Sequence, residues 1–324
     1  MMSVAVRWLG CALLLGAGMN CAAAGYPDKP LRMIVGFPPG GGADIMARLI
    51  SEPLGPRLGV QVVVDNRPGA GSSTGTGLAA KATPDGYTLL FSTPGLTINP
   101  NLYKSVPFDP VRDFAPVSQV ASSPFVLVVQ PSLSANSIPE LIALAKAKHG
   151  AMNYSSGGNG STGHLAAELF KSMAGVQIQH VPYKGLAPAL ADLMGGRVEM
   201  TFSSLPSCIG YIKGKRLKAL AVTTAQRMPF VPDIPTLAES GLPGYDVDQW
   251  YGVLAPAGTP KTVVDTLHNA LSSFLEKPDA ALAEKFAALG TRPTITTPDQ
   301  FAAFIEENLK LWARVVKLSG ARVE

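Results

Sequence analysis

The sequence predicts an α/β protein of two domains. Short runs of strand-forming residues alternate with segments of helical spacing, and Gly-rich loops fall where a predicted strand gives way to a helix. The chain has 324 residues, more than the roughly 100 to 200 of one domain. With 47% hydrophobic residues it can build a core in each domain. One large domain is the second choice.

The first 24 residues predict a signal peptide. Arg7 supplies a positive charge, an apolar run follows at residues 8–19, and Ala22 to Ala24 fit the small residues of a cleavage site. The apolar run is shorter than the roughly 20 residues that span a bilayer, so a membrane anchor is the second choice. Lipidation at Cys21 is disfavoured because the preceding residues do not suit it. We expect export, with cleavage near Ala24 and a soluble periplasmic protein as the product.

The mature chain begins with a predicted strand, helix and strand. Residues 31–37 (LRMIVGF) and 60–65 (VQVVVD) are rich in strand formers, and residues 43–52 between them have helical spacing. The next elements are predicted as a helix, a strand and a proline-rich irregular stretch, at residues 78–82, 87–92 and 94–116.

A second α/β block is predicted from residue 125. Residues 125–130 (FVLVVQ) form a buried strand by composition. Ser137 caps the next helix, Pro139 is tolerated in its first turn, and Glu140 completes a capping box. Further strands are predicted at residues 152–155, 177–181, 198–202 and 217–223, and helices at 165–173 and 186–194. The last third is predicted to hold a strand at 250–254 and helices at 262–275, 280–289 and 298–318.

Charge and cysteine content exclude several classes of protein. The net charge is +4, from 27 Lys and Arg against 23 Asp and Glu, and no basic block suggests a nucleic-acid binder. Removal of the signal peptide leaves Cys208 as the one cysteine, so an internal disulfide is not possible. Because no base is near it in the sequence, we interpret Cys208 as a packed small hydrophobe and not as a nucleophile.

Residues 36–44 (GFPPGGGAD) form the first loop that predicts a function. The loop lies where a strand ends and a helix begins, so its glycines allow close approach of a ligand to the free amides of the helix start. Asp44 can cap or brace the turn. A P-loop is excluded because no Gly-Lys-Ser/Thr follows. The alternative is a tight turn that needs glycine for its geometry alone.

The second loop, residues 154–164 (YSSGGNGSTGH), combines amides with hydroxyls, which suits a carboxylate. Ser161 and His164 raise the alternative of a serine hydrolase, but the G-x-S-x-G elbow is absent. His164 and Glu168 raise the alternative of a metal pair, for which a third ligand is not visible. We expect His164 to act as a capping or hydrogen-bonding residue.

Two further loops are weaker indicators of binding. Residues 180–185 (HVPYKG) offer the Tyr183 hydroxyl and ring, the Lys184 charge and a flexible Gly185, and a purely structural role is about as well supported. Residues 69–77 (GAGSSTGTG) resemble a dinucleotide fingerprint, but the glycine spacing is not G-x-G-x-x-G. We interpret this segment as a flexible loop between a strand and a helix.

Taken together, six segments resemble the Bug family, the periplasmic substrate-binding proteins of tripartite tricarboxylate transporters. They are residues 26–30 (YPDKP), 37–48 (FPPGGGADIMAR), 65–72 (DNRPGAGS), 159–170 (NGSTGHLAAELF), 181–185 (VPYKG) and 255–260 (APAGTP). The resemblance covers essentially the whole mature chain, in the right order, with no clear departure in the loops.

The resemblance implies a type II periplasmic-binding-protein fold, in which two α/β domains close on a small carboxylate. It implies residues 25–121 and 246–324 for the first domain and 122–245 for the second. Carried over by motif, the ligand contacts of the first domain would be Phe37, Pro38, Gly41, Gly42, Ala43, Asp44, Ser92 and Thr93. Those of the second would be Ser155, Gly157, Ser161, Thr162, His164, Tyr183, Lys184 and Gly185, with Ser203 and then Asp248 and Trp250 as further candidates.

The expected function follows from the resemblance. A monomeric binding protein would capture a dicarboxylate, tricarboxylate, acidic amino acid or aromatic carboxylate and deliver it to the membrane permease of a tripartite tricarboxylate transporter. The alternatives are a periplasmic sensor that presents the carboxylate to a receptor kinase and, less favoured, an exported hydrolase. We expect no catalytic activity, no metal or other cofactor and no nucleic-acid partner. The sequence does not identify the carboxylate.

Overall fold

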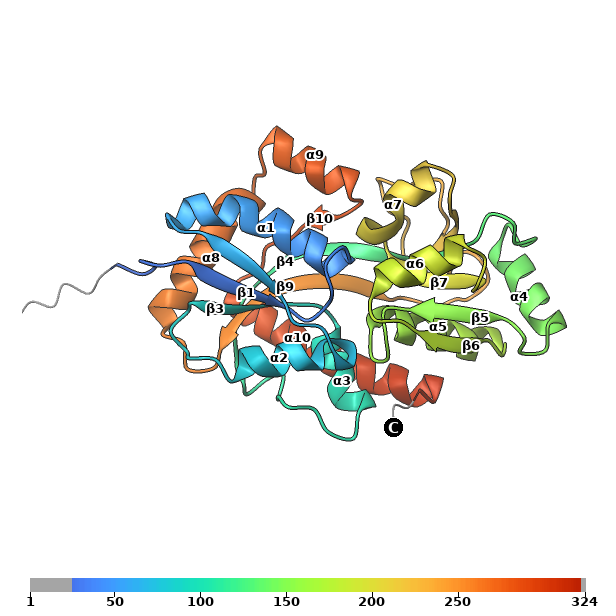
Figure 1. Ribbon diagram of the computed structural model, residues 1–324, viewed down its shortest axis with the longest axis horizontal. Coiled ribbons are helices and arrows are strands. Elements are labelled where there is room, and N and C mark those ends of the chain that lie inside the picture. Colours follow the sequence, from blue (N-terminus) through green and yellow to red (C-terminus); the bar gives the residue numbers. More distant parts are fainter. Residues whose placement is uncertain (1–24, 322–324) are drawn as a thin grey trace, which may run out of the picture.

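The computed structural model describes residues 25–321 and has two α/β halves connected by long strands (Figure 1). The predicted signal peptide lies outside the described residues. The first part of the chain forms β1 (Leu31–Val35), α1 (Gly42–Leu58), β2 (Val62–Asn66), the short 3-10 helix η1 (Ala70–Ser72), α2 (Ser73–Ala80), β3 (Thr88–Ser92) and α3 (Gly95–Leu102).

The middle of the chain forms β4 (Phe114–Val129), α4 (Ile138–Ala147), β5 (Asn153–Ser156), α5 (Thr162–Ala174), β6 (Gln179–Pro182), α6 (Leu186–Met194), β7 (Met200–Ser204), α7 (Leu205–Lys213) and β8 (Lys218–Val222). The last part forms β9 (Asp248–Pro256), α8 (Lys261–Leu275), α9 (Ala280–Ala288), β10 (Arg292–Pro293) and α10 (Pro298–Ser319).

The strands follow the order β2-β1-β3-β9-β4-β7-β5-β6. On one side β1 pairs in parallel with β2 and β3, and on the other β5 pairs in parallel with β6 and β7. Strands β4 and β9 run antiparallel to each other, and beyond Pro124 strand β4 continues into the second half, where it pairs with β7 and β8. The two halves are therefore joined by β4 and β9, the arrangement that allows one half to rotate against the other.

Each half buries apolar residues of its own. In the first half the side chains of β1, β3 and β9 pack against α1 and α8, and in the second those of β4, β5 and β7 pack against α5. Helix α10 contributes to the apolar cores of both halves. Its residues Phe301 and Ile305 pack against β9 in the first half, whereas Trp312 and Val315 join the core of the second half. The division of the chain into domains by residue number stays a prediction.

Local sequence explains where several helices begin. Ser137 accepts the backbone N–H of Glu140 and caps α4, as predicted. The predicted capping box is incomplete, because the Glu140 carboxylate accepts the N–H of Asn136 at 2.8 Å and not that of Ser137. Thr297 with Gln300 forms a complete capping box at α10. Helix α6 spans residues 186–194, as predicted. Helix α1 is longer than the predicted 43–52, because Pro53 and Pro56 are accommodated inside it.

Two predictions about the first half were wrong. The stretch from 94 to 116 is not irregular throughout, because α3 lies within it and β4 begins at Phe114. The segment 69–77 is not a flexible loop: Gly75 and Gly77 are inside α2. A Cβ at Gly75 would lie 2.9 Å from the Cα of Gly36, so glycine is needed there for close packing. Helix α7 and the short strand β10 were not predicted.

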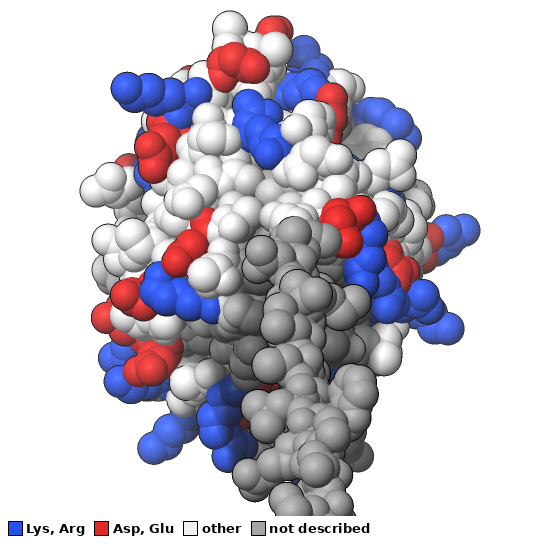
Figure 2. All heavy atoms as spheres, turned by 90° about the vertical axis from the view of Figure 1, so that its left-hand side faces the viewer, with Lys and Arg blue, Asp and Glu red and all other residues white. Residues whose placement is uncertain are grey.

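The surface carries charges of both signs. On the face drawn in Figure 2, Lys and Arg side chains are interspersed with Asp and Glu. Some of these opposite charges form ion pairs, such as Lys285 with Glu52 at 2.8 Å and Lys261 with Asp265 at 2.7 Å. Within residues 25–321, no helix is long and apolar enough to cross a membrane.

Candidate functional site

A cavity of about 50 Å³ lies between the two halves. The first half contributes Phe37, Pro38, Pro39, Gly41, Gly42, Ala43 and Thr93, and the second contributes Gly157, Ser161, Thr162, Gly163, Gly185, Leu186, Ala187, Pro188 and Ser204. Phe125, Gln249 and Tyr251 line it from β4 and β9. None of these lining residues carries a charge, so an anion in this cavity would be bound by neutral hydrogen-bond donors.

Three helices begin at the cavity. The N-cap residues Gly41 of α1 and Gly185 of α6 offer no side-chain cap, and Ser161 caps α5 by accepting the N–H of His164 at 3.4 Å. The first amides of a helix have no partner within the helix and carry the positive end of its dipole. Three such ends directed at one small space form a strong environment for a negative group.

Glycine is required where the halves approach each other. A Cβ at Gly42 would lie 2.3 Å from the Ser204 Oγ, and one at Gly185, whose φ is +113°, would lie 2.9 Å from the Pro38 ring. The Tyr103 hydroxyl also donates to the Asn159 carbonyl across the gap at 2.9 Å. These contacts hold the two halves close together around the cavity.

A wider cavity of about 580 Å³ adjoins the first and shares Phe37, Pro38, Gly157 and Gly185 with it. Tyr183 and Lys184 line this second space. The Tyr183 hydroxyl donates to the Asp192 carboxylate at 2.8 Å, which directs it away from the first cavity. Lys184 is exposed and places a positive charge at this wider cavity.

The predicted site residues fall into two groups. Those at the wall of the first cavity are Phe37, Pro38, Gly41, Gly42, Ala43, Thr93, Gly157, Ser161, Thr162 and Gly185. The others lie outside that wall: Asp44, Ser92, Ser155, His164, Tyr183, Lys184, Ser203, Asp248 and Trp250. As ligand contacts, all of them remain predictions.

Several residues outside the wall support it. Asp44 accepts the N–H of Gly40 at 3.0 Å and pairs with Arg48, and these interactions lower the pKa of its carboxyl although burial opposes them. It therefore braces the first loop as an anion. Ser92 and Ser203 donate to backbone carbonyls of their neighbours, and Trp250 packs on Phe301.

His164 is a hydrogen-bonding residue, as predicted. Its Nδ1 accepts the N–H of Gly160 at 3.3 Å, and its ring stacks on that of His180 with centroids 4.3 Å apart. The Ser161 hydroxyl donates to the Gly158 carbonyl at 2.7 Å, so it is not engaged by a histidine base. Glu168 is occupied by the Tyr154 hydroxyl and Lys171, which leaves no metal pair with His164.

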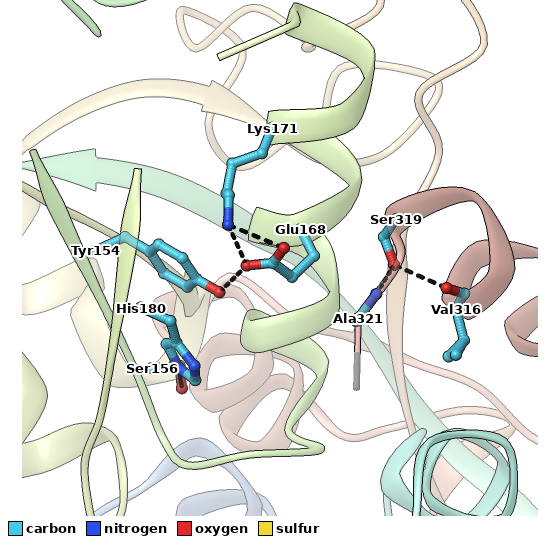
Figure 3. Close-up of polar contacts among 8 residues, drawn as sticks. All are labelled: Tyr154, Ser156, Glu168, Lys171, His180, Val316, Ser319 and Ala321. Carbon is cyan, nitrogen blue, oxygen red and sulfur yellow. Dashed lines mark hydrogen bonds and ion pairs between the residues drawn. The ribbon is translucent and has the colours of Figure 1, made fainter. Parts of the chain in front are cut away.

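Figure 3 shows the polar cluster behind the second loop, formed by Tyr154, Ser156, Glu168, Lys171 and His180. Ser156 and His180 Nε2 lie 2.7 Å apart, and the Tyr154 hydroxyl donates to Glu168 at 2.5 Å. The cluster joins β5, β6 and α5 and so fixes the helix start at Ser161. Among the described residues, no group of three His, Cys, Asp or Glu is placed to hold a metal ion.

Acidification is expected to weaken the protein through the buried, stacked rings of His164 and His180. Burial lowers the pKa of His164 to about 4 and that of His180 to about 3, from the ordinary 6.5. Below pH 6.5 the unfolded chain binds protons at both side chains, whereas the folded protein does not until about pH 4. The contribution of these two histidines to the free energy of unfolding should therefore fall by on the order of 3 to 4 kcal/mol between pH 7 and 5, measured by urea unfolding as the difference between the parent and a variant that lacks both.

The double variant His164→Asn, His180→Asn should lose most of this pH dependence. His149 is exposed, so His149→Asn is the matched control and should keep it. If the free energy of unfolding depends on pH equally in the parent and the double variant, these two histidines do not cause the loss of stability in acid.

Cys208 is fully buried in the second half, which confirms that it is a packed residue, and burial raises the pKa of its thiol to about 12. Sequence reasoning did not name nine of the lining residues as ligand contacts. Six lie in or next to helix starts: Pro39, Gly163, Leu186, Ala187, Pro188 and Ser204. The other three, Phe125, Gln249 and Tyr251, lie on β4 and β9. The available signal was the alternation in residues 248–254, where Gln249 and Tyr251 occupy one face of an otherwise apolar strand.

Comparison with known proteins identifies the family of this chain. A model of the tripartite tricarboxylate transporter family receptor matches residues 46–321. Protein BugT of Bordetella pertussis is 40% identical over 311 residues, covering 95% of both chains. The solved structure of R. palustris Rpa4515 with adipate has a TM-score of 0.88 at 37% identity, covering 92% of this chain and all of the other.

MatC of Rhodopseudomonas palustris with bound malate has a TM-score of 0.85 at 28% identity, covering 90% of this chain and all of the other. These similarities confirm the predicted two-domain periplasmic-binding-protein fold and the absence of enzymatic function. The chain belongs to the tripartite tricarboxylate transporter receptor family and is a periplasmic solute-binding protein of the TctC and Bug type.

Proposed function

We propose that this protein captures a small carboxylate in the periplasm by cleft closure and delivers it to the membrane permease of a tripartite tricarboxylate transporter. The observation that carries the proposal is the charge-free cavity at which α1, α5 and α6 begin. Adipate and malate, the ligands of Rpa4515 and MatC, are both dicarboxylates.

The helix starts supply enough binding energy for a useful affinity. A hydrogen bond to a charged group contributes about 1.5 to 3 kcal/mol, and micromolar affinity corresponds to about 8 kcal/mol. A carboxylate held by three or four amides reaches that range without an Arg or Lys in the cavity.

Closure follows from the division of the site between the halves. Gly41 and Gly42 belong to the first half, and Ser161 and Gly185 to the second. A ligand that contacts both sets binds the closed form more tightly than the open one and so shifts the population toward it. Lys184, at the wider cavity beside the first, attracts the anion before closure.

The experiment that tests capture compares acids with their amides. The mature chain, from residue 25, is titrated calorimetrically with succinate, malate, adipate, aspartate and benzoate, and with the corresponding uncharged amides. At least one acid should bind with micromolar affinity and its amide at least 100-fold more weakly. Equal affinity for an acid and its amide, or no binding by any acid, would overturn the proposal.

Delivery requires a separate measurement. Membrane vesicles that contain a tripartite tricarboxylate permease of the same organism should accumulate the labelled acid when the binding protein is added, and should not do so without it. Uptake that is independent of the binding protein would contradict delivery and favour a sensor.

A further inference from the structure

The second loop contains the one place in the sequence where an asparagine precedes a glycine, Asn159-Gly160. The loop connects β5 to α5, and Gly158 and Gly160 on either side of Asn159 have φ of +120° and +77°. Asn159 is half-buried in the wall of the wider cavity of about 580 Å³, so water reaches its side chain. Because glycine has no Cβ to obstruct the approach, its backbone nitrogen can attack the side-chain amide of a preceding asparagine.

A base lies at the nitrogen of this glycine. The backbone N–H of Gly160 donates to Nδ1 of His164 at 3.3 Å. His164 is 5% exposed, and burial lowers its pKa to about 4, so Nδ1 is an unprotonated acceptor at neutral pH. The ring stacks on that of His180, with centroids 4.3 Å apart, which holds it in this orientation. The Gly160 nitrogen therefore has a fixed proton acceptor.

The first half restrains the same peptide group. The Tyr103 hydroxyl donates to the Asn159 carbonyl at 2.9 Å, and a Cβ at Gly71 would lie 2.3 Å from that oxygen. Attack of the Gly160 nitrogen requires the peptide group to rotate. These contacts therefore slow the reaction while the halves are together.

We propose that Asn159 is a self-modification site, at which His164 promotes conversion of the asparagine to aspartate or isoaspartate and so lowers the affinity for an anionic ligand. His164 takes the proton of the Gly160 N–H, the nitrogen forms a bond to Cγ of Asn159, and the Cγ–Nδ2 bond breaks. Nδ2 leaves as ammonia with that proton. Water then opens the cyclic imide, so an amide is exchanged for a carboxylate without oxidation or reduction.

The new carboxylate lies beside the candidate site. Residue 159 comes two positions before Ser161, the N-cap of α5, which lines the first cavity. A negative charge there repels a carboxylate in the cleft and offsets the charge of Lys184 in the same cavity wall. This effect on affinity rests on the proposed capture of a carboxylate, whereas the modification itself does not.

The test follows the mature chain, from residue 25, during incubation at neutral pH without ligand. Peptide mass spectrometry measures the fraction of residue 159 that carries a carboxylate, and a methyltransferase specific for isoaspartate labels the isomerised product. Conversion at Asn159 should be at least about tenfold faster than at the exposed Asn136 and Asn269, which precede serine and alanine. Conversion no faster than at these two would overturn the proposal.

Two histidine variants separate the base from the structural role of the stack. His164→Asn removes the base and should slow conversion at least about tenfold. His180→Asn disturbs the same stack and leaves His164 at Gly160, so it is the matched control and should not slow conversion. Equal rates in the parent and His164→Asn, or equal slowing in both variants, would overturn the role of His164. Tyr103→Phe should speed conversion, and an unchanged rate would overturn the restraint by the first half.

Affinity is measured separately by calorimetric titration. Asn159→Asp should bind the best acid about tenfold more weakly than the parent, an effect of the size expected for one like charge nearby. The affinity of the parent should fall as conversion proceeds, whereas Asn159→Ser, which has no amide to lose, should keep its own. Equal affinity of Asn159→Asp and the parent overturns the effect on binding. Failure of every acid in the amide comparison overturns the proposed function, while the mass measurement still decides whether Asn159 converts.

Discussion

Replacing Gly41 with valine is expected to abolish carboxylate binding in a protein that still folds. Gly41 has φ −83° and ψ 164°, a conformation open to any residue, and a Cβ there would meet only the Pro38 carbonyl at 3.7 Å. Because Gly41 lines a cavity of about 50 Å³, the valine side chain takes space that the ligand needs. The affinity for the best acid should fall at least about 100-fold, or about 2.7 kcal/mol, by calorimetric titration.

Gly210→Val is the matched control for this change. Gly210 lies on α7, is exposed, and has no atom within 4 Å of a Cβ built on it. The Gly210→Val variant should bind the acid with the same affinity as the parent protein. Unchanged affinity in Gly41→Val would remove the first loop from the site.

The second large effect, a loss in the free energy of unfolding, is expected for Trp312→Ala. Helix α10 begins in the first half, yet Trp312 is 2% exposed in the core of the second half, and its Nε1 donates to Asn308 at 3.3 Å. Deleting a buried Trp side chain removes apolar contacts and leaves a cavity, which costs about 3 to 5 kcal/mol. Urea unfolding should show this loss in the free energy of unfolding.

Leu318→Ala on the same helix is the control, because Leu318 is 68% exposed. It should change the free energy of unfolding by less than about 0.5 kcal/mol. A loss below about 1 kcal/mol in Trp312→Ala would contradict the packing of α10 against the second half.

Local patterns predicted much of the fold. The cap residue Ser137 and the glycine before Leu186 mark helix starts that depend on neighbouring residues alone, and α4 and α6 were found where expected. Helix α3 was missed because Pro100 inside it predicts a break, whereas its buried packing stabilises the helix. The glycines of α2 were misinterpreted because their role is to contact Gly36 and Pro107, distant in sequence.

The candidate site was partly predictable for the same reason. The loops that contain Gly41, Ser161 and Gly185 each reveal a helix start by themselves, and the structure brings all three to one cavity. Phe125 and Tyr251 reach that cavity because two strands more than 100 residues apart cross between the halves, a long-range pairing that no local pattern encodes. The positions of these residues as ligand contacts remain to be measured.

The most direct measurement of the central claim is a crystal structure of the mature chain with the acid that binds best. The account predicts carboxylate oxygens about 3 Å from backbone nitrogens at the starts of α1, α5 and α6, with no Arg or Lys in contact. A carboxylate bound instead by a charged side chain, or a ligand located outside the cleft, would contradict it.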